Sequence, residues 1–298
     1  GGGAPMVVPR AIVRDLHTGA EATRLMSLLM LVFSVSPILA PLIGSFIIDA
    51  AGWRAIFWGV TAIGVIGLLL TAWSLEETRP AEERQDSSIA STLRAFAVLM
   101  RNGRFLGLTA IGGFGMASFF VYLANSSFVL INHYGLTPRE YSLAFAVNAA
   151  SFIGVSQFTG RLTARYGLPR VVSVAVVGFA VSMCALLALN LAGIDRLDVM
   201  IVMLLVGYGF LGLVVPTTSV LALDDHGEFA GAASALMGTL QMVLGAVVIA
   251  VMSAFTDETA RPMVAGIAVS ALVALALTRW TLGNGRRMAP AAAARPCG

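Results

Sequence analysis

The chain has 298 residues, of which 58% are hydrophobic and 12% are charged, and its net charge is +3. Soluble domains are about 45–50% apolar and about 25% charged, so the apolar excess is too large for one buried core. This composition excludes a soluble globular enzyme, a disordered chain and a disulfide-stapled secreted module, and it indicates an all-α polytopic membrane protein.

Charge-free apolar runs predict the membrane spans, because a helix needs roughly 20 largely apolar residues to cross about 30 Å of hydrocarbon. In chain order the runs cover residues 25–48, 55–75, 105–132, 142–160, 171–194, 199–223, 229–256 and 262–278. A shorter run, residues 1–9, is expected to be the end of a further helix, because the chain starts with Gly1 and has no signal-peptide pattern. We therefore expect eight complete transmembrane helices and an N-terminally truncated one.

The distribution of arginine predicts the orientation. All 19 basic residues are arginines, and 15 of them lie in the connections on one side of the predicted membrane. Positively charged connections stay in the cytoplasm, so the arginine-rich side and the C-terminus are expected to be cytoplasmic. The net positive charge therefore indicates the orientation in the membrane and not a nucleic-acid partner.

In the first complete span, small residues recur at helical spacing beside two prolines. Ser36, Ala40 and Gly44 stand four residues apart, and Pro37 and Pro41 follow the first two. Proline removes a backbone donor and kinks a helix, while small residues allow helices to approach closely. The pattern predicts a bent and tightly packed helix.

The connection at residues 76–104 is the one long polar segment between spans. Within it, apolar residues recur at helical spacing opposite Arg94 and Arg101; they are Leu93, Phe96, Ala97 and Met100. This pattern predicts an amphipathic helix at the cytoplasmic interface, inside a linker between two groups of helices.

Uncharged polar side chains fall at membrane depth, whereas no acid lies near the middle of a complete span. The candidates for lining a substrate cavity are Tyr122, Asn125, Asn148 and Gln241. An amide that faced lipid would leave its hydrogen bonds unmade, so these groups should face other helices or an aqueous cavity. The alternative is simple interhelical hydrogen bonding, worth about 0.6 kcal/mol on average.

Several short motifs have structural interpretations. Gly231, Ala235, Gly238 and Gly245 share roughly one helical face and predict close packing. The sequence Gly207-Tyr208-Gly209-Phe210-Leu211-Gly212 matches GxGxxG but lacks a preceding strand, so it indicates helix packing and not a dinucleotide site. Thr137-Pro138-Arg139-Glu140 predicts a capping box, and neither the acidic cluster at 224–228 nor the two cysteines suggest a metal site.

At this point the sequence resembles the major facilitator superfamily, and more narrowly its Bcr/CflA drug-resistance subfamily. Three segments carry most of the resemblance. Arg10-Ala11-Ile12-Val13-Arg14-Asp15-Leu16 is similar to the end of the family's fourth helix, Ser36-Pro37-Ile38-Leu39-Ala40-Pro41-Leu42-Ile43-Gly44 resembles the antiporter motif of its fifth helix, and Gly160-Arg161-Leu162-Thr163-Ala164-Arg165-Tyr166-Gly167 resembles its repeated cytoplasmic loop. Ala164 replaces the aspartate usual in that loop, and Tyr134-Gly135-Leu136-Thr137 matches the turn before the eighth helix.

The resemblance implies a two-lobed transporter that exports drugs in exchange for protons by alternating access. Residues 1–75 would be the remainder of the N-terminal lobe, 76–104 the inter-lobe linker, 105–282 the C-terminal six-helix lobe and 283–298 a cytoplasmic tail. The family's membrane-embedded acid would precede Gly1, which would explain why no proton carrier is visible. The expected setting is the bacterial inner membrane, with the proton gradient as driving force, amphipathic small molecules and protons as partners, no cofactor and a monomeric state.

Two alternatives remain open at the level of sequence. One is a major facilitator transporter of a specific metabolite such as an amino acid or a sugar. The other is a structural or sensing membrane protein. A membrane-embedded enzyme would need a convergent nucleophile, base or metal set at depth, and the sequence shows none.

Overall fold

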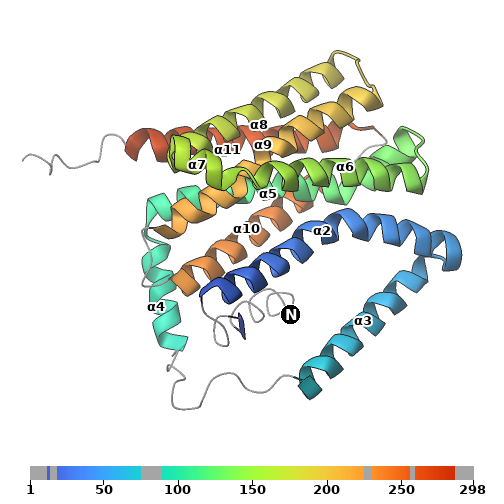
Figure 1. Cartoon of the computed structure of the whole chain (residues 1–298). Coiled ribbons are helices and arrows are strands. Elements are labelled where there is room, and N and C mark those ends of the chain that lie inside the picture. The colour runs from blue at the N-terminus through green and yellow to red at the C-terminus, as the bar shows by residue number, and fades with distance from the viewer. Residues whose placement is uncertain (1–11, 14–18, 75–88, 225–229, 256–258, 286–298) are drawn as a thin grey trace, which may run out of the picture. The chain divides into compact units, whose positions relative to one another are not determined.

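The computed structural model describes residues 12–13, 19–74, 89–224, 230–255 and 259–285, which are helical apart from short connections (Figure 1). No strand occurs among these residues, which confirms the all-α prediction. The chain divides into two compact units, Gly1–Ser87 and Ser88–Gly298, and each is described by itself.

The first unit contains a helical hairpin, formed by α2 (Gly19–Ala51) and α3 (Trp53–Ser74). Gly52 makes the corner with φ +77°, a conformation that a residue with a side chain rarely adopts. The Arg54 guanidinium stacks over the Trp53 ring at 4.5 Å. Helix α2 runs without interruption through Pro37 and Pro41, and it changes direction along its length as the two prolines predict (Figure 1).

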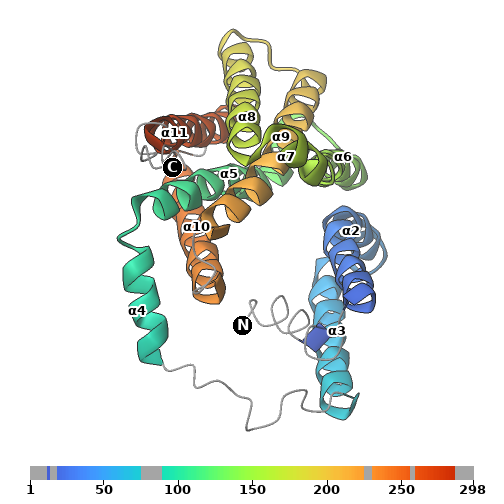
Figure 2. The ribbon, with the colours of Figure 1, turned by 60° about the vertical axis from the view of Figure 1, so that its left-hand side comes forward.

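The second unit is a bundle built around the two helices α5 and α9. Its elements are α4 (Ile89–Leu99), α5 (Gly103–Ser127), the π-helix η2 (Phe128–His133), α6 (Pro138–Ser156), α7 (Thr159–Tyr166), α8 (Leu168–Leu191), α9 (Leu197–Asp224), α10 (Ala230–Ser253) and α11 (Arg261–Gly285). Helix α5 packs against α9, α10 and α11, while α6 and α8 pack on α9 (Figure 2). Glycines let these neighbours approach: Gly107 faces Thr281 of α11, and Gly115 faces Leu211 of α9.

Seven of the eight predicted complete spans are confirmed. Seven helices in the described part of the chain are long and apolar enough to cross a membrane, and they match seven of the eight predicted runs. The remaining run, residues 25–48, lies within the 33-residue helix α2, and residues 1–9 lie outside the described residues. The ends differ most at α11, which extends to Gly285 beyond the predicted residue 278. Helix α6 begins earlier than predicted because Thr137 and Glu140 form the predicted capping box.

The linker helix α4 forms where the apolar spacing predicts it, and it packs against the protein through residues other than most of the predicted apolar face. Ala95 and Leu99 are buried, and α4 contacts α10. Leu93 and Met100 from the predicted apolar face are exposed. The sequence pattern could not separate a face that packs on protein from one that faces lipid, because both are apolar.

Two other motifs take a different form from the one expected. Residues 160–166, predicted as part of a loop, belong to the short helix α7, which ends at Gly167 with φ +79°. On α10 the predicted small-residue face is only partly used within this unit, because Gly245 faces Phe120 whereas a Cβ at Gly231 or Gly238 would meet no described atom within 4 Å.

Candidate functional site

An aromatic cluster lies where α5, α6 and α9 meet. It contains Phe119 and Tyr122 from α5, Phe145 and Phe152 from α6, and Tyr208 from α9. The ring of Tyr122 stacks on Phe145 with centroids 5.8 Å apart, and it lies 5.4 Å from the ring of Tyr208. Phe119 stacks on Phe152 at 6.1 Å and meets Tyr208 edge-on at 6.0 Å. Such offset and edge-on contacts stabilise the packing beyond the area that they bury.

Asn148 of α6 brings hydrogen-bonding capacity into this cluster. Its Nδ2 donates to the Tyr122 hydroxyl oxygen at 3.3 Å, and its side chain is buried. Its Oδ1 is also buried, and no described residue donates to it. A buried acceptor without a partner costs about 1–3 kcal/mol, so this oxygen marks a position where a donor from a ligand or from water would be stabilising.

The predicted amide Asn125 does not join the aromatic cluster. Its Nδ2 donates to the Val121 carbonyl of its own helix at 2.9 Å. The neighbouring Ser126 instead makes a 3.2 Å hydrogen bond with the Tyr141 hydroxyl of α6. Asn125 therefore has a local structural partner, while Tyr122 and Asn148 form the cross-helix pair.

Gln241 belongs to a second polar position, which we call the Gln241 site and which also includes Gly112 of α5 and Thr218 of α9. A Cβ placed on Gly112 would lie 2.9 Å from Gln241 Nε2 and 2.9 Å from Thr218 Oγ1, so both side chains adjoin this glycine. Gln241 Nε2 is buried and has no described hydrogen-bond partner. Gly112 and Tyr122 are ten residues apart on α5, which separates the two positions by about 15 Å along the helix.

The antiporter-motif residues of α2 lie on an open face of the first unit. Ser36 and Ala40 are exposed, and they line a shallow groove with Val32 and Leu39. The Ser36 hydroxyl donates to the Val32 carbonyl at 2.7 Å. A Cβ on Gly44 would meet no described atom within 4 Å.

The cytoplasmic-loop residues divide into two groups. Arg10, Arg14 and Asp15 lie outside the described residues. In α7, Gly160, Arg161 and Arg165 are exposed, and the Arg165 guanidinium lies 5.3 Å from the centre of the Tyr166 ring.

A hydrogen-bonded cluster that sequence reasoning missed joins η2 to the connection between α8 and α9. The Asp195 carboxylate accepts from His133 Nε2 at 2.6 Å, from Asn190 Nδ2 at 3.3 Å and from the Tyr134 hydroxyl. Partial burial alone would raise the pKa of Asp195, but hydrogen bonds from Tyr134 and His133 and the charges of His133 and Arg261 lower this pKa below its ordinary value. Of this cluster, the sequence singles out only Tyr134, as part of a turn motif, and no sequence pattern indicates that it contacts Asp195.

The GxGxxG segment is confirmed as a packing feature of α9. Gly207 faces Met183 of α8, whereas Gly209 faces Ser151 and Gly212 faces the backbone of Phe152, both on α6. No group of three or more metal-ligating side chains occurs among the residues that the structure describes.

Comparisons with known proteins bear on what this bundle does. A family model described as Major Facilitator Superfamily matches residues 1–250. The chain is 32% identical over 272 residues to the uncharacterized MFS-type transporter YdgK of Bacillus subtilis, covering 91% of this chain and 67% of that protein. It is 26% identical over 267 residues to a bicyclomycin resistance protein homolog of Haemophilus influenzae, covering 88% of this chain and 66% of that protein.

A third similarity is confined to part of the chain. The multidrug resistance protein MdtL of Citrobacter koseri is 30% identical over 156 residues, which are 52% of this chain and 39% of MdtL. The chain thus spans about two thirds of the length of the first two relatives and a smaller share of MdtL.

Proposed function

The chain belongs to the major facilitator superfamily, and on this premise we propose that it exports small amphipathic drugs in exchange for protons. Members of this family are transporters and not enzymes. The names of two relatives support the substrate class, because one is a bicyclomycin resistance homolog and the other a multidrug resistance protein.

The observation that carries the proposed substrate class is the chemistry of the aromatic cluster. Its rings form a buried apolar environment, and Asn148 Oδ1 adds one buried acceptor with no described partner. Sites for small molecules combine mostly apolar walls with a few placed polar groups. Because the groups here are uncharged, they favour neutral or lipophilic compounds that carry a hydrogen-bond donor.

The proposed mechanism is alternating access between two lobes. Residues 1–75 would belong to the N-terminal lobe, 76–104 to the linker, 105–282 to the C-terminal lobe and 283–298 to a cytoplasmic tail. The open face of α2 that carries Ser36, Ala40 and Gly44 would pack at the lobe interface, since small residues permit close helix contact. The arginine distribution supports an inner-membrane orientation with a cytoplasmic C-terminus.

Drug susceptibility of an efflux-deficient bacterium expressing the full-length protein tests the substrate class. We expect resistance to bicyclomycin or to other amphipathic drugs, and we expect Asn148→Ala to lower it about three- to tenfold by removing a polar contact. The control is Asn125→Ala, whose amide bonds to its own helix. If resistance to every compound is unchanged in Asn148→Ala, the aromatic cluster does not bind the substrate. Transport of a single metabolite without transport of any drug would contradict the proposed substrate class.

A further inference from the structure

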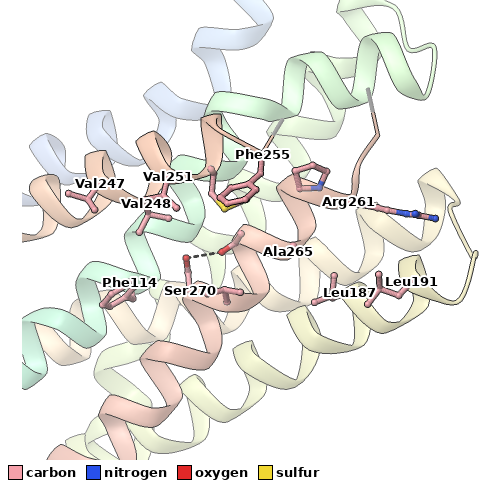
Figure 3. Close-up of a pocket in the computed structure, with 14 residues that line it drawn as sticks. Phe114, Leu187, Leu191, Val247, Val248, Val251, Phe255, Arg261, Ala265 and Ser270 are labelled. Atoms are coloured by element: carbon pink, nitrogen blue, oxygen red, sulfur yellow. Dashed lines mark hydrogen bonds between the residues drawn. The ribbon is translucent and has the colours of Figure 1, made fainter. Parts of the chain in front are cut away.

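Helices α10 and α11 diverge over α5 and α8 and leave an apolar groove of about 500 Å³ (Figure 3). Its walls come from the last turns of α10, with Val247 and Val251, and from the first turns of α11, with Ala265 and Val269. Phe114 of α5 also lines the groove. The groove lies at the end of the bundle that the arginine distribution predicts to be external.

The depth of the groove matches one leaflet of a bilayer. The lining of α11 extends from Arg261 to Ser270, nine residues or about 14 Å of helix, which is about half of a 30 Å hydrocarbon core. Ser270 at the inner end needs no hydrogen-bond acceptor from a ligand, because its hydroxyl already donates to the Gly266 carbonyl at 2.8 Å. The inner part of the groove therefore suits a hydrocarbon chain.

The groove is open along its side. Val247, Val251 and Val269 are 53%, 53% and 56% exposed, although they belong to helices apolar enough to span a membrane. Within the second unit no described residue covers these side chains, and apolar surface of this kind suits contact with lipid in a bilayer. An acyl chain can thus enter the groove from the side without any opening of the bundle.

Arg261 is the one charged residue among those that line the groove, and it lies at one end (Figure 3). Its charge contributes to lowering the pKa of Asp195, but the oxygens of that carboxylate already accept from Tyr134, His133 and Asn190. Guanidinium groups bind phosphate through parallel hydrogen bonds. In the sequence, Asp257 and Glu258 precede Arg261 and lie outside the described residues, so the test must measure the effect of ligand charge directly.

We propose that this groove is a binding site for an anionic phospholipid. One acyl chain lies between α10 and α11, and the headgroup phosphate pairs with Arg261 at the membrane surface. The combination of a leaflet-deep apolar groove with a single cation at its polar end is what selects this ligand. A second copy of the chain would meet an arginine with no matching acid among the described residues that line the groove, and a neutral drug would make no ion pair with the guanidinium.

Photolabelling tests the site. The full-length protein is reconstituted in phosphatidylcholine nanodiscs with a trace of phosphatidylglycerol carrying a diazirine on one acyl chain, and the labelled peptides are mapped by mass spectrometry. We expect labels within residues 247–255 and 262–270. Arg261→Gln should reduce this labelling about fivefold, the effect of one basic residue near an anionic surface. Ala265→Trp should block it by filling the groove.

Matched controls decide the outcome. Arg139→Gln removes an exposed arginine on the same predicted side of the membrane, at the first turn of α6, and should leave labelling unchanged. A phosphatidylcholine probe with the same diazirine should label the groove about fivefold less. Equal labelling by both lipids, no loss in Arg261→Gln, or an equal loss in Arg139→Gln would overturn the proposal. Cross-linked protein dimers or displacement of both probes by an amphipathic drug would also overturn it, by assigning the groove to another occupant. If Ala265→Trp fails to fold, Arg261→Gln and the two lipids still decide.

Discussion

The tightest contact between α6 and α9 gives a prediction that can be worked from the geometry. A Cβ at Gly212 would overlap the carbonyl oxygen of Phe152 and would lie 3.1 Å from its carbonyl carbon. Carbon atoms pack at about 3.5–4.0 Å, so the contact with the carbonyl carbon alone would require the helices to separate locally by about 0.4–0.9 Å, and the overlap with the oxygen requires a larger separation. The two helices are also tied by the Ser151 hydroxyl, which donates to the Leu205 carbonyl at 2.7 Å. The Phe152 carbonyl oxygen belongs to the backbone of α6, so it cannot rotate away from the added methyl group as a side chain could.

We therefore expect Gly212→Ala to destabilise the protein. Overpacking costs about 1–3 kcal/mol, and the better helix propensity of alanine returns up to about 1 kcal/mol, which leaves a net loss of up to about 3 kcal/mol, centred on about 1–2 kcal/mol. This corresponds to a thermal midpoint lower by roughly 2–6 °C. The assay is the loss of the monodisperse peak on size-exclusion chromatography after heating the fluorescently tagged protein in detergent.

The matched control is Gly154→Ala, on α6 two residues from Phe152. Its Cβ would meet no described atom within 4 Å, so only the gain in helix propensity remains and the midpoint should rise. If Gly212→Ala leaves the midpoint unchanged or raises it as Gly154→Ala does, the described α6–α9 contact is wrong.

Four further substitutions test the polar positions of the second unit and the small-residue face of α2. Asp195→Asn should lower the thermal midpoint by roughly 2–4 °C at pH 7. Because the folded pKa of Asp195 is lowered, its contribution is complete above the ordinary carboxyl pKa. The difference from the wild type should therefore shrink as the pH falls below about 4 and disappear below the folded pKa, and a difference that does not shrink at all would contradict the role of its charge. Gln241→Ala should change drug resistance while Gln157→Ala, at the exposed break after α6, should not, and equal effects in susceptibility tests would refute the distinction. Tyr122→Phe should lower resistance to drugs that carry a hydrogen-bond donor about threefold in the same tests, because it removes the hydroxyl that holds the Asn148 amide and so leaves Asn148 Oδ1 less well positioned for the drug. Gly44→Leu should abolish resistance while leaving the protein inserted in the membrane, as judged by fractionation. Normal drug export by this variant would contradict the proposal that α2 packs at the lobe interface.

The positions of the helices could be predicted from the sequence, because apolar length and charge placement are local properties. The capping box at Thr137 and the packing role of the glycines in α9 followed from the same kind of local reasoning. The packing face of α4 could not be predicted, because lipid and protein select the same apolar residues. The helical form of residues 160–166 was also missed, since a polar stretch between two spans gives little indication of whether it forms a loop or a short helix.

The candidate site was predictable in its residue types but not in its contacts. Polarity at membrane depth singled out Tyr122, Asn148 and Gln241, yet only the fold shows that the first two meet and that Gln241 adjoins Gly112. Tyr208 was hidden inside a motif that was interpreted only as packing, although its ring completes the aromatic cluster. The Asp195 cluster joins residues about 60 positions apart, and no local pattern encodes that contact.

Drug-coupled proton movement is the most direct test of the proposed function. Everted membrane vesicles containing the full-length protein are acidified inside by respiration, and a pH-sensitive dye reports the release of protons when a drug is added. We predict drug-dependent proton release together with drug uptake into the vesicles, both abolished by an uncoupler. Drug uptake that continues unchanged after the proton gradient is collapsed, or addition of drugs without any proton release, would contradict drug:proton antiport.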